Sequence, residues 1–379
     1  MKRLLERLGP GLSDHHWILL LFLPFDFMVA LTLILADIAS WPLLLFSAKA
    51  KKKPLPKPDL SRASIIVLNW EGRHLLEEFL PSVVEAVKHD GRDHEILVVD
   101  NGSRDGSVEF LKAHFPSVRV IPLDRNRRFT GGNNAGVAAA KNDIVVFLNN
   151  DMEVDRDFLK PLLDGFQDET VFAVSCQVFF QDKTRRREET GNTKARWRLG
   201  FIEPYHGEVP EKGAGGQSYL PIFWGGGGSC AFDRNKFLAM GGLDTLYDPF
   251  YLEDTDLSYQ AWKRGWKSLL AVGSVVVHKH RGTNKQKFGD NFVDNTIRKN
   301  QYLFIWKNIT FFPWTLSHVL YLPIIQAGFL VQTNWQFETK AFFRALRQFP
   351  EALLKRYRRR NEYEMGDPEI FERTGKPAN

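Results

Sequence analysis

The chain has 379 residues, enough for one large α/β domain with extensions, and its 44% hydrophobic and 25% charged residues are typical of a globular protein. Its two cysteines, Cys176 and Cys230, exclude a disulfide scaffold and show no CxxC zinc spacing, so we expect reduced thiols in the cytosol. The formal net charge is +6 and the basic residues are clustered, which suits anionic lipid headgroups or phosphorylated substrates. Because no nucleic-acid-binding module accompanies the clusters, we expect no nucleic-acid partner.

The N-terminal part is dominated by an apolar stretch over residues 17–46, longer than the ~20 residues that one membrane-spanning helix needs. Pro24, Asp26, Asp37 and Pro42 interrupt it, and prolines and carboxylates disfavour an unbroken helix in lipid. Two interpretations remain: a tilted single span, or a broken helical hairpin that dips into one leaflet. Basic residues flank both ends, so the positive-inside rule mildly favours the hairpin, with both ends in the cytoplasm.

The next part of the chain alternates apolar strands with helices, the pattern of an α/β domain. We expect strands at 64–69, 95–100, 118–123 and 144–148, with helices at 74–89 and 133–141. Continuous apolar runs of this kind are typical of parallel strands covered on both faces. The expected fold is therefore a doubly wound, mostly parallel sheet with helices on both faces. In that fold, ligands bind beyond the carboxyl ends of the strands.

The last part of the chain is aromatic and helical in pattern. A second apolar stretch at 309–331 is broken by Pro313 and Pro323 and followed by a basic amphipathic tail, which fits helices in the membrane interface better than a clean span. The predicted division is a membrane-associated segment with a basic linker at 1–58, the α/β domain at 59–290, and an interfacial helical region at 291–379.

Polar residues follow the predicted strands where ligands bind in this architecture. Asn69 and Asp100 end the first two strands, and the fourth strand runs into Asn149, Asn150 and Asp151. A carboxylate beside an amide carbonyl offers the oxygen ligands that suit Mg²⁺ or Mn²⁺, ions that bridge nucleotide phosphates. Taken alone, the triplet is better explained as an Asx turn that ends the strand.

A glycine-rich segment, Gly131-Gly132-Asn133-Asn134, opens the second predicted helix. Glycines allow close approach of the backbone to a ligand, and a helix N-terminus favours negative charge. The segment is not a P-loop, because no Lys-Ser/Thr pair follows it. Taken alone, it is equally consistent with a tight helix start.

Three carboxylates fall within four residues at Glu253, Asp254 and Asp256. Because neighbouring carboxylates repel one another, we interpret the group as functional, with one carboxylate acting as a base and the others held by backbone or cation. The alternative is an acidic first turn of a helix that runs to Trp262.

Two histidines, His278 and His280, lie on one side of a later predicted strand, where one of them is a candidate metal ligand or phosphate donor. An ordinary core or surface role is about equally consistent with them. The glycine run from Gly225 to Gly228, directly after Trp224, indicates close approach to a ligand or a flexible turn.

In this order, the segments resemble the family 2 inverting glycosyltransferases with a GT-A fold, especially the rhamnosyltransferase-like branch. The resemblance covers about residues 62 to 285, and it is the ordered set, not any single motif, that is specific. The segments that carry it are SIIVLNW (64–70), VVDNGSRDGS (98–107), FTGGNNAG (129–136), FLNND (147–151), GGLD (241–244), FYLEDTDL (250–257) and HKHRGT (278–283).

The resemblance implies a nucleotide-sugar site at the strand ends, in which Asn69 and Asp100 contact the base and the ribose. The full expected set is Asn69, Asp100, Asn101, Gly132, Asn133, Asn134, Asn149 and Asn150. Asn149 and Asp151 match the D-x-D motif, with Asp151 as the ligand of a Mg²⁺ or Mn²⁺ cofactor. Two positions depart from the family pattern, because Asn149 replaces Asp and Glu71 stands where Asn is common.

The resemblance also implies the catalytic roles. Asp254 matches the base, with Glu253 beside it and Asp256 as its rival, and His278 matches a late histidine that contacts metal or diphosphate. The reaction would be a single inverting displacement that moves a sugar from a nucleoside diphosphate to an acceptor hydroxyl.

The acceptor side is expected between residues 177 and 223, with Trp197, Trp224 and Arg186 as candidate contacts. The expected donor is dTDP- or UDP-linked, and the expected acceptor is a glycan or lipid-linked glycan of cell-envelope polysaccharide synthesis. We expect the chain to contact membrane lipids at the cytoplasmic face of the inner membrane. The alternatives are a nucleotidyltransferase acting on sugar phosphates and an inactive membrane-bound scaffold of the same fold.

Overall fold

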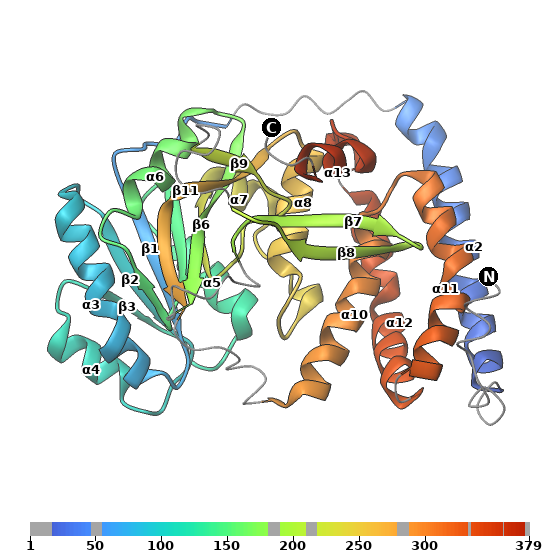
Figure 1. Cartoon of the computed structure of the whole chain (residues 1–379), viewed down its shortest axis with the longest axis horizontal. Coiled ribbons are helices and arrows are strands. Elements are labelled where there is room, and N and C mark those ends of the chain that lie inside the picture. The colour runs from blue at the N-terminus through green and yellow to red at the C-terminus, as the bar shows by residue number, and fades with distance from the viewer. Residues whose placement is uncertain are drawn as a thin grey trace. The chain divides into compact units, whose positions relative to one another are not determined.

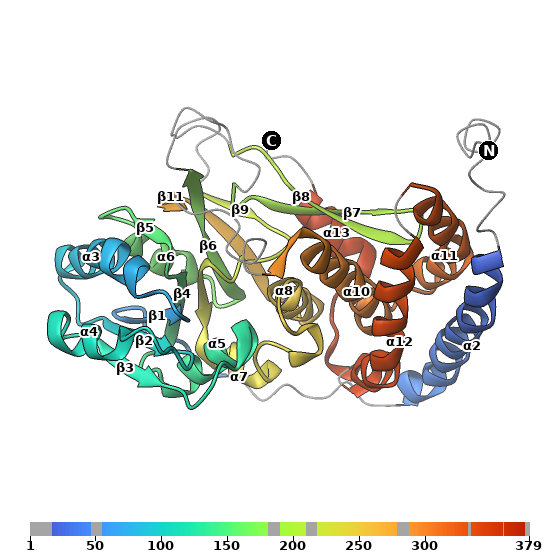
Figure 2. The ribbon, with the colours of Figure 1, turned by 90° about the horizontal axis from the view of Figure 1, so that it is seen from below.

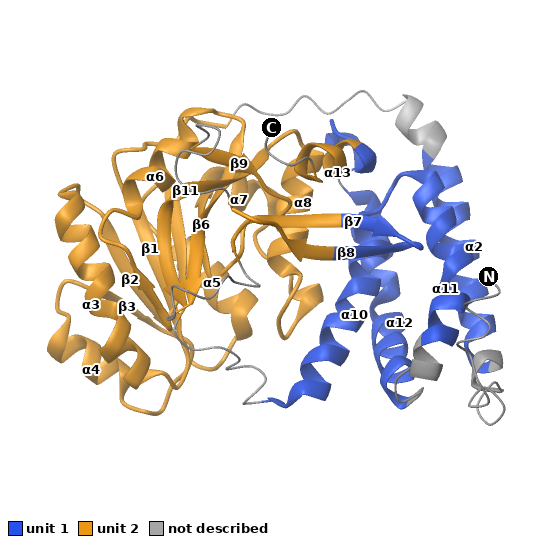
Figure 3. Ribbon diagram, viewed as in Figure 1, with its two compact units in different colours: residues 1–52, 196–203, 284–368 blue, residues 53–195, 204–283, 369–379 orange. Residues whose placement is uncertain are grey.

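The computed structural model describes residues 17–46, 55–180, 190–209, 218–278, 288–332, 335–358 and 360–375. The chain divides into two compact units (Figure 3). Unit 1 contains residues 1–52, 196–203 and 284–368, and unit 2 contains residues 53–195, 204–283 and 369–379. Unit 1 therefore joins segments from both ends of the chain, while unit 2 contains most of the middle.

Unit 2 is an α/β domain built on a nine-stranded sheet (Figure 1). Its strands are β1 (Ala63–Asn69), β2 (Glu95–Asp100), β3 (Arg119–Pro122), β4 (Ile144–Asn149), β5 (Met152–Val154), β6 (Val171–Phe180), β9 (Tyr219–Pro221), β10 (Ser229–Asp233) and β11 (Lys267–His278). Its helices are α3 (Arg73–Asp90), α4 (Ser107–His114), α5 (Arg128–Ala139), α6 (Leu159–Asp164), α7 (Arg234–Met240) and α8 (Glu253–Lys263), with short 3-10 turns at Gly165–Gln167 and Thr245–Tyr247.

The strand order is β3-β2-β1-β4-β10-β6-β11-β5, and β9 also pairs with β11. The first four strands of this order run parallel, as their continuous apolar sequences predict. Beyond them, β10 lies antiparallel between β4 and β6, so the sheet becomes mixed. The register places Asn69 beside Asp100, and Leu68 beside Asn149, so the polar strand ends share one edge of the sheet.

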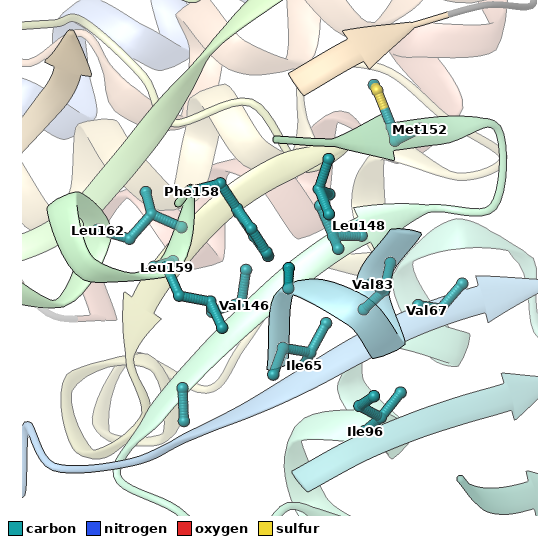
Figure 4. Close-up of a cluster of buried hydrophobic side chains, with 14 of the residues drawn as sticks. Ile65, Val67, Val83, Ile96, Val146, Leu148, Met152, Phe158, Leu159 and Leu162 are labelled. Atoms are coloured by element: carbon teal, nitrogen blue, oxygen red, sulfur yellow. The ribbon is translucent and has the colours of Figure 1, made fainter. Parts of the chain in front are cut away.

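Alternate residues of the parallel strands enter two separate hydrophobic layers. In β1, Ile65 and Val67 pack with α3 and α6, whereas Ile66 packs with α5 and α7 on the other face. Figure 2 shows α3 and α6 on one side of these strands and α5 and α7 on the other. Figure 4 shows side chains of β1 and β4 meeting Leu159 and Leu162 in the first layer. A sheet covered on both faces requires strands that are apolar throughout, which explains the continuous runs.

Two local features of unit 2 differ from the predictions. Helix α5 begins at Arg128 and ends at Ala139, so Gly132 lies in its second turn and not at its opening. The stretch after Phe180, in which we found no periodicity, contains a two-stranded hairpin of β7 (Thr193–Arg198) and β8 (Phe201–His206), whose middle residues belong to unit 1.

Unit 1 consists mainly of four helices, α2 (Trp17–Phe46), α10 (Asp290–Asn308), α11 (Phe312–Gln332) and α12 (Trp335–Arg358). A short turn follows at Arg360–Glu362, and α13 (Asp367–Gly375) begins in unit 1 and continues into unit 2. Within unit 1, α2 packs along α11 and α10 packs along α12 (Figures 1 and 2).

The favoured helical hairpin at residues 17–46 is wrong, because α2 is one continuous helix across Pro24 and Pro42. The carboxylates that argued for a break have partners inside unit 1. The guanidinium of Arg356 donates to Asp37 over 2.7 Å, and the amide of Gln326 donates to Asp26 over 3.1 Å. Pairing removes most of the cost of a carboxylate in an apolar helix. By length and composition, α2 is able to cross a membrane over Leu21–Ser40.

Candidate active site

The ends of β1, β2 and β4 form a connected polar cluster. The amide nitrogen of Asn69 donates to Asp100 Oδ1 over 3.2 Å and to Ser107 Oγ over 3.0 Å, and Asn150 Nδ2 donates to Asn69 Oδ1 over 2.8 Å. Asn69 and Asp100 are fully buried, so these bonds satisfy groups that would otherwise be costly to bury. The second oxygen of Asp100 accepts from the backbone of Ser103 over 3.0 Å.

Gly72 makes this cluster possible. A Cβ at this position would lie 2.3 Å from Asn150 Nδ2 and 2.6 Å from Asn69 Oδ1, inside any tolerable contact. The chain therefore needs glycine where it leaves β1 and enters α3, so that the amide of Asn150 reaches Asn69. Sequence reasoning missed this residue, because a single glycine after a strand is not a specific signal.

The predicted contacts on and near α5 are engaged with the protein itself. Asn101 accepts from the backbone of Arg127 over 2.7 Å, and Asn134 exchanges two hydrogen bonds of 2.9 Å with the backbone of Leu243. Asn133 Nδ2 donates to its own helix at Phe129 over 3.1 Å. A Cβ at Gly132 would lie 2.4 Å from Leu68 Cδ1, so this glycine lets α5 pack closely on β1. The GGNN segment thus has a structural explanation in helix packing and loop attachment.

The predicted metal pair comes together at the join of β4 and β5. Asp151 immediately precedes β5, whose Met152 pairs with His278 of β11, and this register leaves 3.1 Å between Asp151 Oδ2 and His278 Nε2. The two side chains are 8% and 14% exposed. Residues distant in sequence therefore meet because β5 and β11 are antiparallel neighbours. His280 lies outside the described residues.

The pair has the chemistry of a divalent-cation site. Asp151 Oδ1 is buried without a hydrogen-bond partner, which leaves one oxygen of the carboxylate available for coordination. In the described part of the chain, no group of three or more His, Cys, Asp or Glu side chains is arranged around a common point. This fits Mg²⁺ or Mn²⁺ bound with a substrate, because such ions take one or two protein ligands and complete their coordination with phosphate oxygens and water.

The glycine loop 225–228 links the end of β4 to the start of α8. The backbone of Asn149 donates to the carbonyl of Gly228 over 2.9 Å, and the backbone of Gly227 donates to Asp254 Oδ2 over 2.9 Å. A Cβ at Gly228 would lie 2.7 Å from Asn149 Nδ2. The loop therefore lies between Asn149, at the end of β4, and the carboxylate group of α8. It explains why small residues occupy this run.

Asp254 is the partly exposed member of the carboxylate group, and Glu253 is buried beside it. Burial raises the pKa of Asp254 above its ordinary value of 3.8, against the lowering effect of hydrogen bonds from Gly227 and Thr255. Burial, and then the charge of Asp254, raise the pKa of Glu253 well above 4.5. Glu253 Oε2 has no hydrogen-bond partner. The arrangement suits one reactive carboxylate, Asp254, beside a buried carboxyl group whose pKa is raised.

Asp256, the rival base, is 2% exposed and accepts a hydrogen bond from the Tyr247 hydroxyl over 2.8 Å. It points into the protein from the first turn of α8 and holds the 3-10 turn that contains Tyr247. This contact was not predicted from the sequence, and it gives Asp256 a structural role. An acceptor hydroxyl has better access to Asp254 than to Asp256.

Strained backbone precedes the carboxylate group. Tyr251 and Leu252 both adopt left-handed conformations, with φ of 71° and 72°, which cost non-glycine residues of order 1–3 kcal/mol each. Glu71, after β1, and Arg128, at the start of α5, have φ of 50° and 62°. Strain of this kind persists where the surrounding structure over-determines it, and it clusters at functional sites.

The three acceptor-side candidates have different surroundings. Trp224, which adjoins the glycine loop, is partly exposed, and its backbone is fixed through exchanged hydrogen bonds of 2.9 and 2.6 Å with the Thr193 hydroxyl. Trp197 belongs to unit 1 and stacks on Trp314, with ring centroids 4.9 Å apart, so one of its faces is occupied. Arg186 lies outside the described residues.

Comparisons with known proteins show which proteins parts of this chain resemble. Residues 64–230 match the model of "Glycosyl transferase family 2". The chain is 28% identical over 267 residues to polypeptide N-acetylgalactosaminyltransferase 11 of Xenopus tropicalis, a match that covers 66% of this chain and 44% of that protein. It is 26% identical over 238 residues to N-acetylglucosaminyl-diphospho-decaprenol L-rhamnosyltransferase of Mycobacterium tuberculosis, which covers 56% of this chain and 75% of that protein.

A solved structure, GalNAc-T7 with UDP, GalNAc and Mn²⁺, aligns over 76% of this chain and 58% of that chain at 16% identity, with a TM-score of 0.48. The match to the Xenopus tropicalis protein spans less than half of that protein's length. The predicted α/β sheet with helices on both faces is present in unit 2, and its parallel part consists of the first four strands, β1 to β4. The family match over residues 64–230, the ordered motifs and the relatives together support a family 2 glycosyltransferase domain in this chain.

Proposed function

We propose that the chain transfers a sugar from a nucleoside-diphosphate donor to a hydroxyl of a glycan or lipid-linked glycan acceptor, with inversion at the anomeric carbon. The observation that carries the proposal is the glycine loop, which contacts Asp254 through Gly227 and Asn149 through Gly228. A partly exposed base and the polar strand ends are thereby brought to the same part of unit 2. Both are needed if an acceptor hydroxyl is to attack a bound nucleotide sugar.

Asp254 acts as the general base in this proposal. As the acceptor oxygen forms its bond to the anomeric carbon, Asp254 takes the hydroxyl proton, and the bond from the anomeric carbon to the diphosphate breaks on the opposite face. The raised pKa makes Asp254 a stronger base than an exposed aspartate. Burial and the charge of Asp254 raise the pKa of Glu253 well above 4.5, which disfavours a second negative charge beside Asp254.

Asp151 and His278 are the residues that would hold a Mg²⁺ or Mn²⁺ ion with the diphosphate. Such an ion, when bound, supplies positive charge to the leaving group. Asp151 Oδ1 is the protein oxygen available to it. Asn150 directly precedes Asp151 in the sequence and is hydrogen-bonded to Asn69, which is hydrogen-bonded to Asp100. In this proposal these three residues form the nucleotide side of the site.

The substrate class follows from the relatives. The name of the Mycobacterium tuberculosis relative describes a rhamnosyl transfer to a lipid-linked diphosphate sugar, and the other relative transfers N-acetylgalactosamine to polypeptide. We favour a lipid-linked glycan acceptor, because the apolar helix α2 gives this chain a way to remain near lipid. A dTDP- or UDP-linked donor at the cytoplasmic face of the inner membrane completes the proposal.

The test is nucleotide release from a panel of nucleotide sugars with Mn²⁺, Mg²⁺ or EDTA, in membrane-lipid extract. The proposal expects turnover of one donor with metal, loss of that turnover with EDTA, and loss with Asp254→Asn. Absence of turnover for every donor, with the lipid extract present, would overturn the proposal in favour of the inactive scaffold.

A further inference from the structure

The helices α2 and α11 of unit 1 have their polar and apolar faces reversed relative to a soluble protein. Between Leu21 and Ser40, the exposed positions of α2 are all apolar. They are Leu21, Leu23, Pro24, Phe27, Met28, Leu31, Leu35, Ile38 and Ala39. A surface helix of a soluble protein has charged and polar residues on that face.

The buried face of α2 is the one that contains polar groups. Its buried residues recur three or four apart along the helix and include Asp26, Asp37 and Ser40. Asp37 is paired with Arg356 and also accepts from the Tyr357 hydroxyl over 2.8 Å, while Asp26 accepts from Gln326. Polar residues of membrane-embedded helices behave in this way, facing the bundle interior and pairing there.

Helix α11 repeats the reversal independently. Over residues 312–328 its exposed positions are Pro313, Leu316, Leu320, Tyr321 and Ile324. Of its four buried positions, three are polar, namely Thr315, His318 and Gln326. His318 donates through Nδ1 to the carbonyl of Gly200 over 2.8 Å and accepts from Trp306 Nε1 over 3.1 Å.

Helix α12 of the same unit provides an internal comparison. Its exposed positions include Lys340, Arg347, Glu351 and Arg358, as expected of a helix that faces water. Pro350 and Leu354 are the apolar residues among its described exposed positions, and Leu354 is 74% exposed. The reversal is therefore a property of α2 and α11, and it is absent from the described face of α12.

We propose that α2 and α11 together form a lipid-facing surface whose exposed side chains lie in the hydrocarbon of a bilayer. The surface is defined by Leu21, Leu23, Phe27, Met28, Leu31, Leu35 and Ile38 of α2 and by Leu316, Leu320, Tyr321 and Ile324 of α11. Phe27 and Leu320 are 69% and 61% exposed, so each helix contributes large apolar area. The sequence predicted that residues 309–331 lie in the membrane interface; the proposal goes further, because it joins α11 and α2 into one surface that enters the hydrocarbon.

The occupant is lipid for two reasons besides polarity. The apolar part of α2 from Leu21 to Ser40 is 20 residues long, which is about 30 Å at 1.5 Å per residue and matches the ~30 Å hydrocarbon thickness of a bilayer. Basic clusters at residues 49–53 and 355–360 follow α2 and end α12 in the sequence. They complement the negative charge of anionic headgroups.

The test places a single new cysteine at Leu35, Leu320 or Leu354 of the full chain, each labelled with an environment-sensitive fluorophore. The native Cys176 and Cys230 are fully buried and remain in place. In phosphatidylcholine–phosphatidylglycerol vesicles, spin-labelled acyl chains should quench the label at Leu35 and Leu320, and aqueous iodide should not. At Leu354, iodide should quench the label more strongly than the spin-labelled acyl chains do. The ratio of lipid quenching to iodide quenching should therefore be several-fold lower there than at Leu35 and Leu320.

Iodide quenching at both Leu35 and Leu320 would overturn the proposal, and quenching by lipid at Leu35 alone would leave α2 as a lone anchor and also overturn it. All three positions are exposed, so substitution there should not unfold the chain, and an unchanged unfolding temperature verifies this. The proposal does not rest on the proposed reaction. An inactive Asp254→Asn protein should give the same labelling pattern, so failure of one proposal is distinguishable from failure of the other.

Discussion

Asp151 and His278, separated by more than a hundred residues, face each other at the edge of the sheet with 3.1 Å between Oδ2 and Nε2, while the second oxygen of Asp151 has no hydrogen-bond partner. A structural ion pair would ordinarily use both oxygens, because a buried carboxylate is costly to leave unsatisfied. The arrangement therefore supports the proposed site for a cation and a diphosphate.

We expect Asp151→Asn to weaken Mn²⁺ binding in the presence of nucleoside diphosphate by about tenfold to a hundredfold, with His278→Ala acting in the same direction. Mn²⁺ electron paramagnetic resonance measures this without turnover. The exposed pair His89–Asp157, with 3.0 Å between Nε2 and Oδ1, is the matched control. If Asp157→Asn has as large an effect as Asp151→Asn, the metal assignment is wrong.

Asp254 and Asp256 can be separated by the same isosteric change. Asp254→Asn removes the base, and we expect kcat/KM to fall by about 10²–10⁴-fold. Asp256→Asn keeps an oxygen that accepts from Tyr247, so its activity should stay near that of the unmodified chain. Transfer kinetics on the donor found by the nucleotide-release panel measure both variants, and the reverse result would make Asp256 the base.

The pH dependence of transfer should show the same carboxylate. Because burial raises the pKa of Asp254, the basic form is lost as the pH falls through a value above the ordinary 3.8. We expect the profile of kcat/KM against pH to have an acid limb in the unmodified chain. This limb should be absent from the profile of Asp254→Asn. If the residual activity of Asp254→Asn still falls along the same acid limb, Asp254 is not the base.

Glu253 makes a prediction about stability. Its raised pKa means that the folded chain holds a proton which the unfolded chain releases, so the stability contributed by the protonated carboxyl is lost as the pH rises above 4.5. Glu253→Gln removes this loss. The unfolding temperature of Glu253→Gln should therefore rise relative to the unmodified chain between pH 5 and pH 8, whereas Glu169→Gln, at an exposed glutamate, should show no such trend.

The glycine loop offers a steric test. Gly228→Ala puts a methyl group 2.7 Å from Asn149 Nδ2, so we expect weaker donor binding and a raised KM for the donor. Gly226→Ala, in the same loop, has no heavy atom within 4 Å and should change KM little. Equal effects of the two substitutions would indicate that loop flexibility, and not the space beside Asn149, is what matters.

The buried pair of unit 1 should be essential to its stability. Asp37→Ala leaves the Arg356 guanidinium buried without its carboxylate, and loss of one partner from such a pair costs about 3–5 kcal/mol. Glu351→Ala, which breaks an exposed pair with Lys355 on α12, should cost about 0.5 kcal/mol or less. Thermal unfolding in lipid nanodiscs compares them, and equal losses would show that α2 is not held by Asp37.

The sequence by itself determined the parallel strands, the order of the motifs and the chemical types of the candidate residues. Continuous apolar runs predicted β1, β2 and β4 because a sheet covered on both faces leaves no polar position, and the strand ends Asn69, Asp100 and Asn149 followed directly. The carboxylate group was visible because like charges so close together repel one another, and the structure places it in the first turn of α8, where a helix favours acidic residues.

Only the tertiary structure decided which of these residues meet and which are already occupied. Asp151 lies beside His278 because β5 and β11 are antiparallel neighbours. Asp256 accepts a hydrogen bond from Tyr247, and Asn134 donates one to the backbone of Leu243. The tertiary structure also showed α2 as a continuous helix whose carboxylates have partners three hundred or more residues away, Arg356 for Asp37 and Gln326 for Asp26. Local pattern reports which residues are costly to bury, and long-range contacts determine whether a partner removes that cost.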